Sequence, residues 1–301
     1  MSVVSIILVN YNQEQLTIKS LESIRRFLDA KETELMVLDN ASRSWEKLQA
    51  YCDSQRVLFF RNEKNLGYAA AVNRCIRQAS GEYIFLLNND AFFIEPFTFR
   101  KVLEEMRGDT GMAGFHILNE DRSTQYSIYR FPSLFYYLMD MIRLSRVFPI
   151  FSDLIRNRKR YTVTGRYRDM YLKGVAMLFH KKTVEDAGLF DEKIFLYGEE
   201  TDLQFRLVKQ GRAILYYPDI RVVHLGSMGT GDNFLKLGYI QKSLLYYFNK
   251  HYGRFSRNVL RAFMMFETGL KSLLFLLFNK EKSSGYLNLF RSLRKNGRSS
   301  L

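Results

Sequence analysis

The sequence predicts an α/β fold, in which a mostly parallel sheet wrapped by helices is followed by an α+β half and C-terminal amphipathic helices. Three observations support this. Strand and helix signals alternate up to residue 87, short polar clusters follow three of the strands, and the pattern after about residue 235 is helical, aromatic and basic. Alternating strands and helices favour a parallel sheet, because each return between parallel strands needs a crossover.

β-branched runs predict the strands of the first half, and apolar residues at helical spacing predict its helices. The expected order is strand 3–9, helix 16–28, strand 34–38, helix 44–52, strand 56–60, helix 68–79 and strand 83–87. In the second half we expect strand 171–180, helix 181–187, helix 199–210 and strands 212–217 and 220–224. Gly188 and Gly211 follow the two helices and are suited to end them.

The formal net charge is +14, and residues 241–301 carry +10 of it. A second basic cluster lies at 143–168. Both have apolar and aromatic neighbours, which favours a membrane surface over nucleic acid, for which no motif is recognised. Charges at Arg261, Glu267 and Lys271 interrupt the apolar run 259–278, so we expect it to lie in the membrane interface without spanning. A helix packed on the catalytic part or on a partner subunit is the alternative.

Other bulk features fit a reducing compartment. Cys52 and Cys75 form no C-x-x-C pair and indicate neither a disulfide framework nor a zinc site. The N-terminal apolar run 3–9 lacks a basic flank and a cleavage site, so we expect no signal peptide. The expected location is the cytoplasm, peripherally on the inner face of the plasma membrane.

Six ordered motifs carry a resemblance to a known family: VSIILVNYN, LDNAS, NEKNLGYAAAVN, LLNND, GLFDEKIFLYGEETDLQFRLVKQG and VVHLGS. They resemble the family 2 glycosyltransferases, and in particular their bacterial rhamnosyltransferase-like branch, over roughly residues 3–230. The resemblance implies a GT-A fold, whose nucleotide-binding sheet is Rossmann-like. It makes 1–234 the catalytic domain, with a nucleotide-sugar half at about 1–115 and an acceptor half at about 116–234. Residues 235–301 form the basic helical extension.

The polar cluster after the second strand suggests a pyrimidine site, because a carboxylate such as Asp39 can accept the N–H of the base. The residues alone favour a helix cap at Asp39, whereas the resemblance puts Asp39 at the base. The resemblance gives further nucleotide-sugar contacts: Asn10, Tyr11, Asn65, Gly67, Asn73, Asn88 and Asn89. For Asn73 a polar helix start is the alternative. Gly67 would let the backbone approach the nucleotide.

A diphosphate leaving group needs its developing charge neutralised, which a divalent cation can do. The family's D-x-D-like motif aligns with Asn88-Asn89-Asp90, so Asp90 is the expected charged ligand and Asn88 a weaker contact. His224 matches the family's second ligand, although a lone histidine on a strand is more often structural. The implied cofactor is Mg²⁺ or Mn²⁺.

Glu199, Glu200 and Asp202 stand at the start of a predicted helix. Acids there commonly complement the helix dipole, but sugar transfer also needs a base. The family motif E-D-x-D makes Glu200 the expected base, with Asp202 or Glu199 as the fallback, and Arg206 is expected to pair with Asp202. Asp191, Glu192 and Gly174 fall in the implied acceptor region, where a turn is the alternative for the two acids.

The resemblance therefore implies an inverting glycosyltransferase that uses dTDP-rhamnose or a UDP-hexose. The acceptor would be a saccharide, in particular a lipid-linked one, in the assembly of a cell-surface polysaccharide such as O-antigen or capsule. The alternative is a non-catalytic membrane- or polyanion-binding protein on a glycosyltransferase-like fold.

Overall fold

The structure is a computed structural model that describes residues 4–28, 33–141, 163–226 and 233–295. The chain divides into two compact units. The first contains described residues of 1–131, 156–195 and 199–228, and the second contains described residues of 132–155, 196–198 and 229–301. Both predicted halves thus contribute to the first unit. Most of the basic cluster at 143–168 lies outside the described residues.

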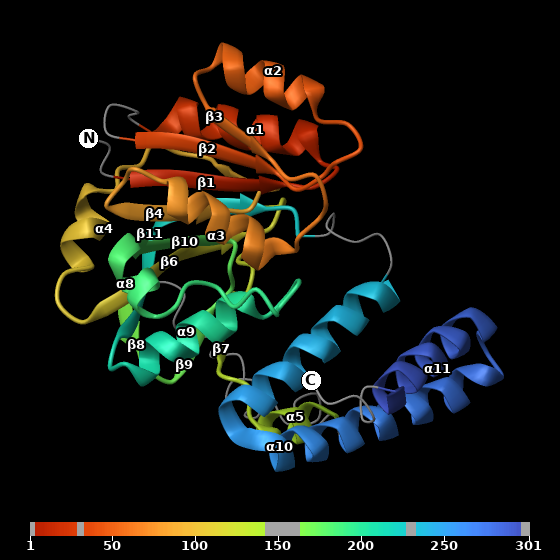
Figure 1. The fold of residues 1–301 in the computed structure, drawn as a ribbon. Coiled ribbons are helices and arrows are strands. Elements are labelled where there is room, and N and C mark those ends of the chain that lie inside the picture. Colours follow the sequence, from red (N-terminus) through yellow and green to blue (C-terminus); the bar gives the residue numbers. More distant parts are fainter. Residues whose placement is uncertain (1–3, 29–32, 142–162, 227–232, 296–301) are drawn as a thin grey trace. The chain divides into compact units, whose positions relative to one another are not determined.

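The first unit is built on one large sheet (Figure 1). Its strand order is β3 (Leu58–Arg61), β2 (Thr33–Asp39), β1 (Val4–Asn10), β4 (Tyr83–Leu87), β10 (Ala176–His180), β6 (Thr110–Leu118), β11 (Ala213–His224) and β5 (Ala91–Phe93). β8 (Gly165–Tyr167) pairs with β11, and β7 (Ile128–Arg130) forms a separate pair with β9 (Met170–Leu172).

The predicted parallel arrangement is confirmed for β3, β2, β1 and β4. The rest of the sheet belongs to the part expected to be α+β, and it is mixed. β10 runs antiparallel to β4 and β6, and β11 runs parallel to β6 but antiparallel to β5 and β8. The β-propensity of single strands carries no information about which direction the chain returns in, and that direction is set by connections outside the strands.

Helices cover both faces of this sheet, as the near-continuous apolar runs of its strands require. The helices over one face are α1 (Glu14–Phe27), α2 (Glu46–Ser54) and α4 (Arg100–Glu105). Those over the other face are α3 (Tyr68–Gln78), α8 (Lys181–Asp186) and α9 (Glu199–Lys209). Alternate strand residues point to the two layers, so that Ile6 packs with the first set and Ile7 with the second.

Two predicted strand boundaries are wrong. The strand expected over 171–180 is two strands, β9 and β10, which Lys173-Gly174-Val175 separates. The two strands expected around Pro218 are the single strand β11, whose register against β6 shifts between Tyr217 and Arg221. Pro218 lies at that irregularity, where the absence of an N–H donor removes no ladder hydrogen bond.

The second unit consists of α5 (Leu134–Met141), α10 (Asn233–Leu276) and α11 (Lys280–Lys295). α10 bends at Gly253, whose φ of 84° is left-handed. α11 packs along α10 through a Ser272–Ser283 hydrogen-bond pair and a stacked Phe275–Tyr286 pair. Among the described residues, no helix combines the length and apolarity needed to cross a membrane.

Candidate active site

Because β1, β2 and β4 are parallel, their carboxyl ends lie at one edge of the sheet, which we call the carboxyl edge. Asn10 is in register with Asp39 there, and its Nδ2 donates to Asp39 Oδ2 over 2.8 Å. Asn88 follows β4, and His224 ends β11 opposite Ala91 of β5. The structure therefore brings the predicted nucleotide cluster and the predicted metal ligands to one side of the sheet, as expected for ligand sites in open α/β sheets.

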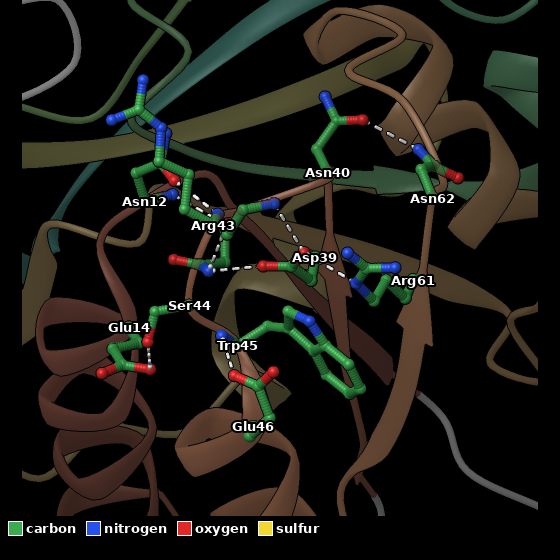
Figure 2. A network of polar contacts seen from close by, with 12 residues as sticks. Asn12, Glu14, Asp39, Asn40, Arg43, Ser44, Trp45, Glu46, Arg61 and Asn62 are labelled. Atoms are coloured by element: carbon green, nitrogen blue, oxygen red, sulfur yellow. Dashed lines mark hydrogen bonds and ion pairs between the residues drawn. The ribbon is translucent and has the colours of Figure 1, made fainter.

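Asp39 organises the loop that follows β2 (Figure 2). Its Oδ1 accepts the main-chain N–H of Ser42 over 2.9 Å and lies 3.8 Å from Nε of Arg61. It does not cap α2, which begins at Glu46. The Asp39 side chain is fully buried, and both of its oxygens face protein donors. Asp39 can therefore reach a base only if the 40–45 loop moves.

The exposed part of this edge is made by Tyr11, an expected nucleotide contact, and by Trp45 and Arg61, which were not among the expected contacts. Trp45, the only tryptophan of the chain, lies beside Arg61 in Figure 2, with the guanidinium 4.6 Å from the ring centroid. Tyr11 is 44% exposed. Arg61 is the last residue of β3, so its position at the end of a strand was the available signal. The edge offers flat rings and a cation beside Asp39, which suits a planar base.

The N-x-G stretch has a structural explanation in this conformation. Asn65 Oδ1 accepts from Asn40 Nδ2 over 2.9 Å and from the main-chain N–H of Gly67. Gly67 has a φ of +85°, and a Cβ there would lie 2.6 Å from the carbonyl oxygen of Phe195. The close backbone approach that requires glycine is thus made by Phe195, whereas we had expected it from the nucleotide.

Asn73, an expected nucleotide contact, is held by protein groups in this structure. It is buried, its Nδ2 donates to the Phe190 carbonyl over 2.8 Å and to Glu192 Oε1 over 2.9 Å, and its Oδ1 accepts from Phe190 N–H. Glu192 also pairs with Arg77, and Asp191 accepts from the N–H of Lys193. Asp191 and Glu192 thus shape a turn that α3 holds in place.

Asp90 and His224 face each other, with 3.3 Å between Asp90 Oδ1 and His224 Nε2. On the other side of the ring, Nδ1 lies 2.7 Å from Gln125 Oε1, an acceptor, which favours the form of neutral His224 with its proton on Nδ1. Nε2 then turns a lone pair towards a carboxylate oxygen. Two acceptors at this distance leave a place for a cation between them, so the pair fits a divalent metal.

The other two polar residues of the LLNND motif, Asn88 and Asn89, have different surroundings. The Asn88 side chain hydrogen-bonds no residue in the described part of the chain, so it is available to a ligand. Asn89 points to α1, where its Nδ2 donates to Gln13 and Thr17. No group of three or more His, Cys, Asp or Glu side chains in the described residues could hold a metal. The protein would thus supply Asp90 and His224, and other ligands must come from Asn88, substrate or water.

Asp202 forms the expected ion pair with Arg206, 2.8 Å away, and this prediction is confirmed. Arg206 also donates to the carbonyl oxygens of Ala187 and Leu189. Asp202 is fully buried, so the pair ties α9 to the turn that follows α8. A carboxylate held in this way has no access to an acceptor hydroxyl, which removes Asp202 as the fallback base.

Glu199 is buried, and its Oε2 has no hydrogen-bond partner among the described residues. Burial, together with the neighbouring charge of Glu200, raises the pKa of Glu199 well above its ordinary value of 4.5. The fold therefore favours the protonated form of Glu199.

Glu200 has room at the start of α9 because residue 174 is glycine. A Cβ on Gly174 would lie 3.1 Å from Cβ and Cγ of Glu200. Gly174 thus lies directly against the side chain of Glu200, the proposed base. Burial, and then the charges of Glu199, Glu200 and Asp90, raise the pKa of Tyr68. The pKa of Tyr68 therefore responds to the charges of both the acidic pair and Asp90, the proposed metal ligand.

Replacing Glu199 with glutamine should stabilise the protein at pH 8 by on the order of 1–3 kcal/mol, because a buried, unpaired carboxylate is costly. Since the folded pKa is raised, the wild type loses stability as pH rises above 4.5 through the folded value, and glutamine does not titrate. Urea denaturation at pH 4.5 and pH 8 measures this. An equal difference between variant and wild type at both pH values would contradict it.

Several known proteins are similar to this chain in sequence. The family described as Glycosyl transferase family 2 matches residues 5–170, more than half of the chain. The putative colanic acid biosynthesis glycosyl transferase WcaA of Escherichia coli is 34% identical over 29% of this chain and 32% of its own length. An N-acetylglucosaminyl-diphospho-decaprenol L-rhamnosyltransferase of Mycobacterium tuberculosis is 27% identical over 65% of this chain and 68% of its own. The chain thus spans about a third of the first relative's length.

Two solved structures share the architecture. The mannosyltransferase PcManGT from Pyrobaculum calidifontis, in complex with GDP-Man and Mn²⁺, has a TM-score of 0.57 at 15% identity and covers 99% of this chain and 76% of its own. GalNAc-T7 with UDP, GalNAc and Mn²⁺ also has a TM-score of 0.57, at 17% identity, over 82% and 50%. The fold is GT-A, as expected from the sequence. The chain belongs to glycosyl transferase family 2.

Proposed function

We propose that the chain is an inverting, metal-dependent glycosyltransferase that takes a sugar from a nucleoside-diphosphate sugar, either dTDP-rhamnose or a UDP-hexose. The observation that carries the proposal is the proximity of two pairs, Asp90 with His224 and Glu199 with Glu200. Gly174 lies against Glu200, and its neighbour Val175 accepts the main-chain N–H of Asn88, two residues before Asp90. Each pair has the chemistry that one end of the transfer requires. The names of the family and of its relatives support the same reaction class.

At the nucleotide end, the base binds beside Tyr11, Trp45 and Arg61, and the 40–45 loop moves to open Asp39 to it. At the diphosphate end, Asp90 and His224 would hold a divalent cation, with Asn88 as a weaker contact. Such a cation, when bound, neutralises the charge that develops on the leaving diphosphate. The two structural neighbours were solved with Mn²⁺ and support this choice of cofactor, although Mg²⁺ has the same role in this chemistry.

At the acceptor end, Glu200 takes the proton of the acceptor hydroxyl as that oxygen bonds to C1 of the donor sugar. The C1–diphosphate bond breaks on the opposite face, so the anomeric configuration inverts. Glu199 stays protonated, which keeps two negative charges from meeting where the acceptor binds. Tyr68 stays neutral, because burial and then the charges of Glu199, Glu200 and Asp90 raise its pKa.

The buried Glu199 also argues against the alternative of a non-catalytic membrane- or polyanion-binding protein. A buried carboxyl oxygen without a hydrogen-bond partner destabilises a fold, and such strain is typical of sites under functional selection. Nothing in the described residues specifically favours the alternative.

The donor is tested by a panel of nucleotide sugars, each measured with Mn²⁺ or Mg²⁺ for its effect on thermal unfolding. A ligand present at 100 times its dissociation constant should stabilise the protein by about 2.7 kcal/mol. We expect a uridine or thymidine nucleotide to do so in the presence of metal. A panel in which no uridine or thymidine diphosphate raises the melting temperature would overturn the donor assignment.

The proposed acceptor is a lipid-linked saccharide in cell-surface polysaccharide assembly, and the proposed location is the inner face of the plasma membrane. The name of the M. tuberculosis relative includes a diphospho-decaprenol acceptor, which supports a lipid-linked one here. The second unit supports it independently through the apolar stripe, five side chains at helical spacing that are 46–85% exposed. The stripe consists of Phe266, Leu270, Leu273, Leu274 and Leu277.

Basic residues near both ends of the apolar stripe complement an anionic lipid surface: Arg254, Arg257, Arg261, Lys280 and Lys282. Burying the stripe in the acyl boundary would remove it from water, and the basic side chains would remain at the headgroups. A partner subunit is the competing occupant.

Replacing Leu273 and Leu277 with aspartate should reduce binding to phosphatidylglycerol vesicles at least tenfold, because both charges would have to enter the apolar boundary. Vesicle co-sedimentation measures this, and Leu58→Asp, a change at an exposed leucine of β3, is the matched control. Wild-type protein that stays in the supernatant, or a double variant that sediments like the control, would contradict the membrane assignment.

A further inference from the structure

Gln125 lies outside all six motifs, yet it contacts the proposed metal ligand His224. Its Oε1 is 2.7 Å from His224 Nδ1, and the two residues are 99 positions apart in the sequence. The amide group of Gln125 is itself held in place. Its Nε2 donates to Asn119 Oδ1 over 3.0 Å and to the main-chain carbonyl of His224 over 3.3 Å. With both amide protons engaged, the oxygen necessarily faces the histidine ring.

The segment that carries Gln125 is also fixed. Its main-chain N–H donates to the Ile117 carbonyl over 2.8 Å, which ties it to the end of β6. Asn119, which orients the Gln125 amide, donates from Nδ2 to Ser123 Oγ over 2.9 Å, and its main-chain N–H bonds the Ser123 carbonyl. A short closed turn thus supports the glutamine, so its position does not depend on a ligand.

We infer that Gln125 is a positioning residue: it holds the proton of neutral His224 on Nδ1 and keeps Nε2 unprotonated and aimed at Asp90. Imidazole binds a metal through an unprotonated nitrogen, and the hydrogen bond at the other nitrogen sets which one is free. Two acceptors face the ring, Gln125 Oε1 at 2.7 Å from Nδ1 and Asp90 Oδ1 at 3.3 Å from Nε2, and the closer one is that of Gln125. The inference deepens the metal-site part of the proposed function and rests on it.

Three variants separate this role from simple packing. Gln125→Leu keeps the approximate volume and removes the acceptor, whereas Gln125→Glu keeps an acceptor oxygen. Gln210→Leu, at an exposed glutamine at the end of α9, is the matched control. The first readout is the tautomer of His224 in metal-free protein, from long-range ¹H–¹⁵N spectra of the four histidines, assigned with His224→Gln. The second is the affinity for Mn²⁺ alone, by electron paramagnetic resonance of free Mn²⁺.

We expect the wild type, Gln125→Glu and Gln210→Leu to carry the proton on Nδ1, and Gln125→Leu to lose that preference. Affinity for Mn²⁺ should fall 10- to 100-fold in Gln125→Leu and be restored to within a few fold in Gln125→Glu. A Gln125→Leu protein with the wild-type tautomer overturns the inference. If the wild type binds no Mn²⁺, the metal part of the proposed function fails, and the tautomer spectra still decide the role of Gln125.

Discussion

Replacing Asp90 with alanine should abolish metal-dependent sugar transfer, with a rate loss of at least 100-fold. Asp90 is the one carboxylate of the LLNND motif, and it lies 3.3 Å from His224. Its removal therefore takes away the charged half of the proposed metal pair. The rate of nucleoside diphosphate release, with Mn²⁺ and with a chelator, measures the effect.

The matched control is Asn88→Ala. Its neutral side chain is a weaker ligand, so we expect a loss of about tenfold or less. Folding of the Asp90 variant should be preserved, because the contact of this residue with Leu225 is made by its main-chain carbonyl. Asp90→Ala protein that keeps its metal dependence and a rate within threefold of wild type would contradict the assignment.

Replacing Glu200 with glutamine should lower the transfer rate by 10²- to 10⁴-fold while nucleotide and metal binding persist. Glutamine keeps the shape of the side chain beside Gly174 but cannot accept a proton from the acceptor hydroxyl. Single-turnover rates and nucleotide titrations separate the two effects. Loss of nucleotide binding in parallel with the rate would place Glu200 in the donor site and contradict a role as base.

The first four strands could be predicted from the sequence because each contains a run of apolar residues, which is buried in β1, β2 and β4 and partly exposed in β3 at the edge of the sheet. The carboxyl edge was also predictable, since the polar residues after β1, β2 and β4 must meet there. The mixed second half was not predictable, because its strands pair with partners far away in the sequence: β10 pairs with β4, and β5 and β8 both pair with β11.

The roles of single site residues were less predictable than their positions. The sequence identifies Asp39 and Asn73 as polar residues near a nucleotide, but only packing shows that the first is fully buried and the second bonds the Phe190 backbone. The Asp202–Arg206 pair was predictable from its i, i+4 spacing. Gln125 belongs to none of the six motifs, and its contact with His224 joins two residues 99 positions apart in the sequence, so this contact was not predictable.

The mechanism assigns Glu200 as the base and Glu199 as its protonated neighbour. One comparison of initial rates at pH 7.5 tests this assignment most directly. Because burial raises the pKa of Glu199 and so favours its neutral form, Glu199→Gln should keep transfer within about tenfold of wild type. Glu200→Gln should fall by at least 100-fold in the same assay. The reverse order, with Glu200→Gln active and Glu199→Gln inactive, would make the buried carboxyl the base and contradict the mechanism.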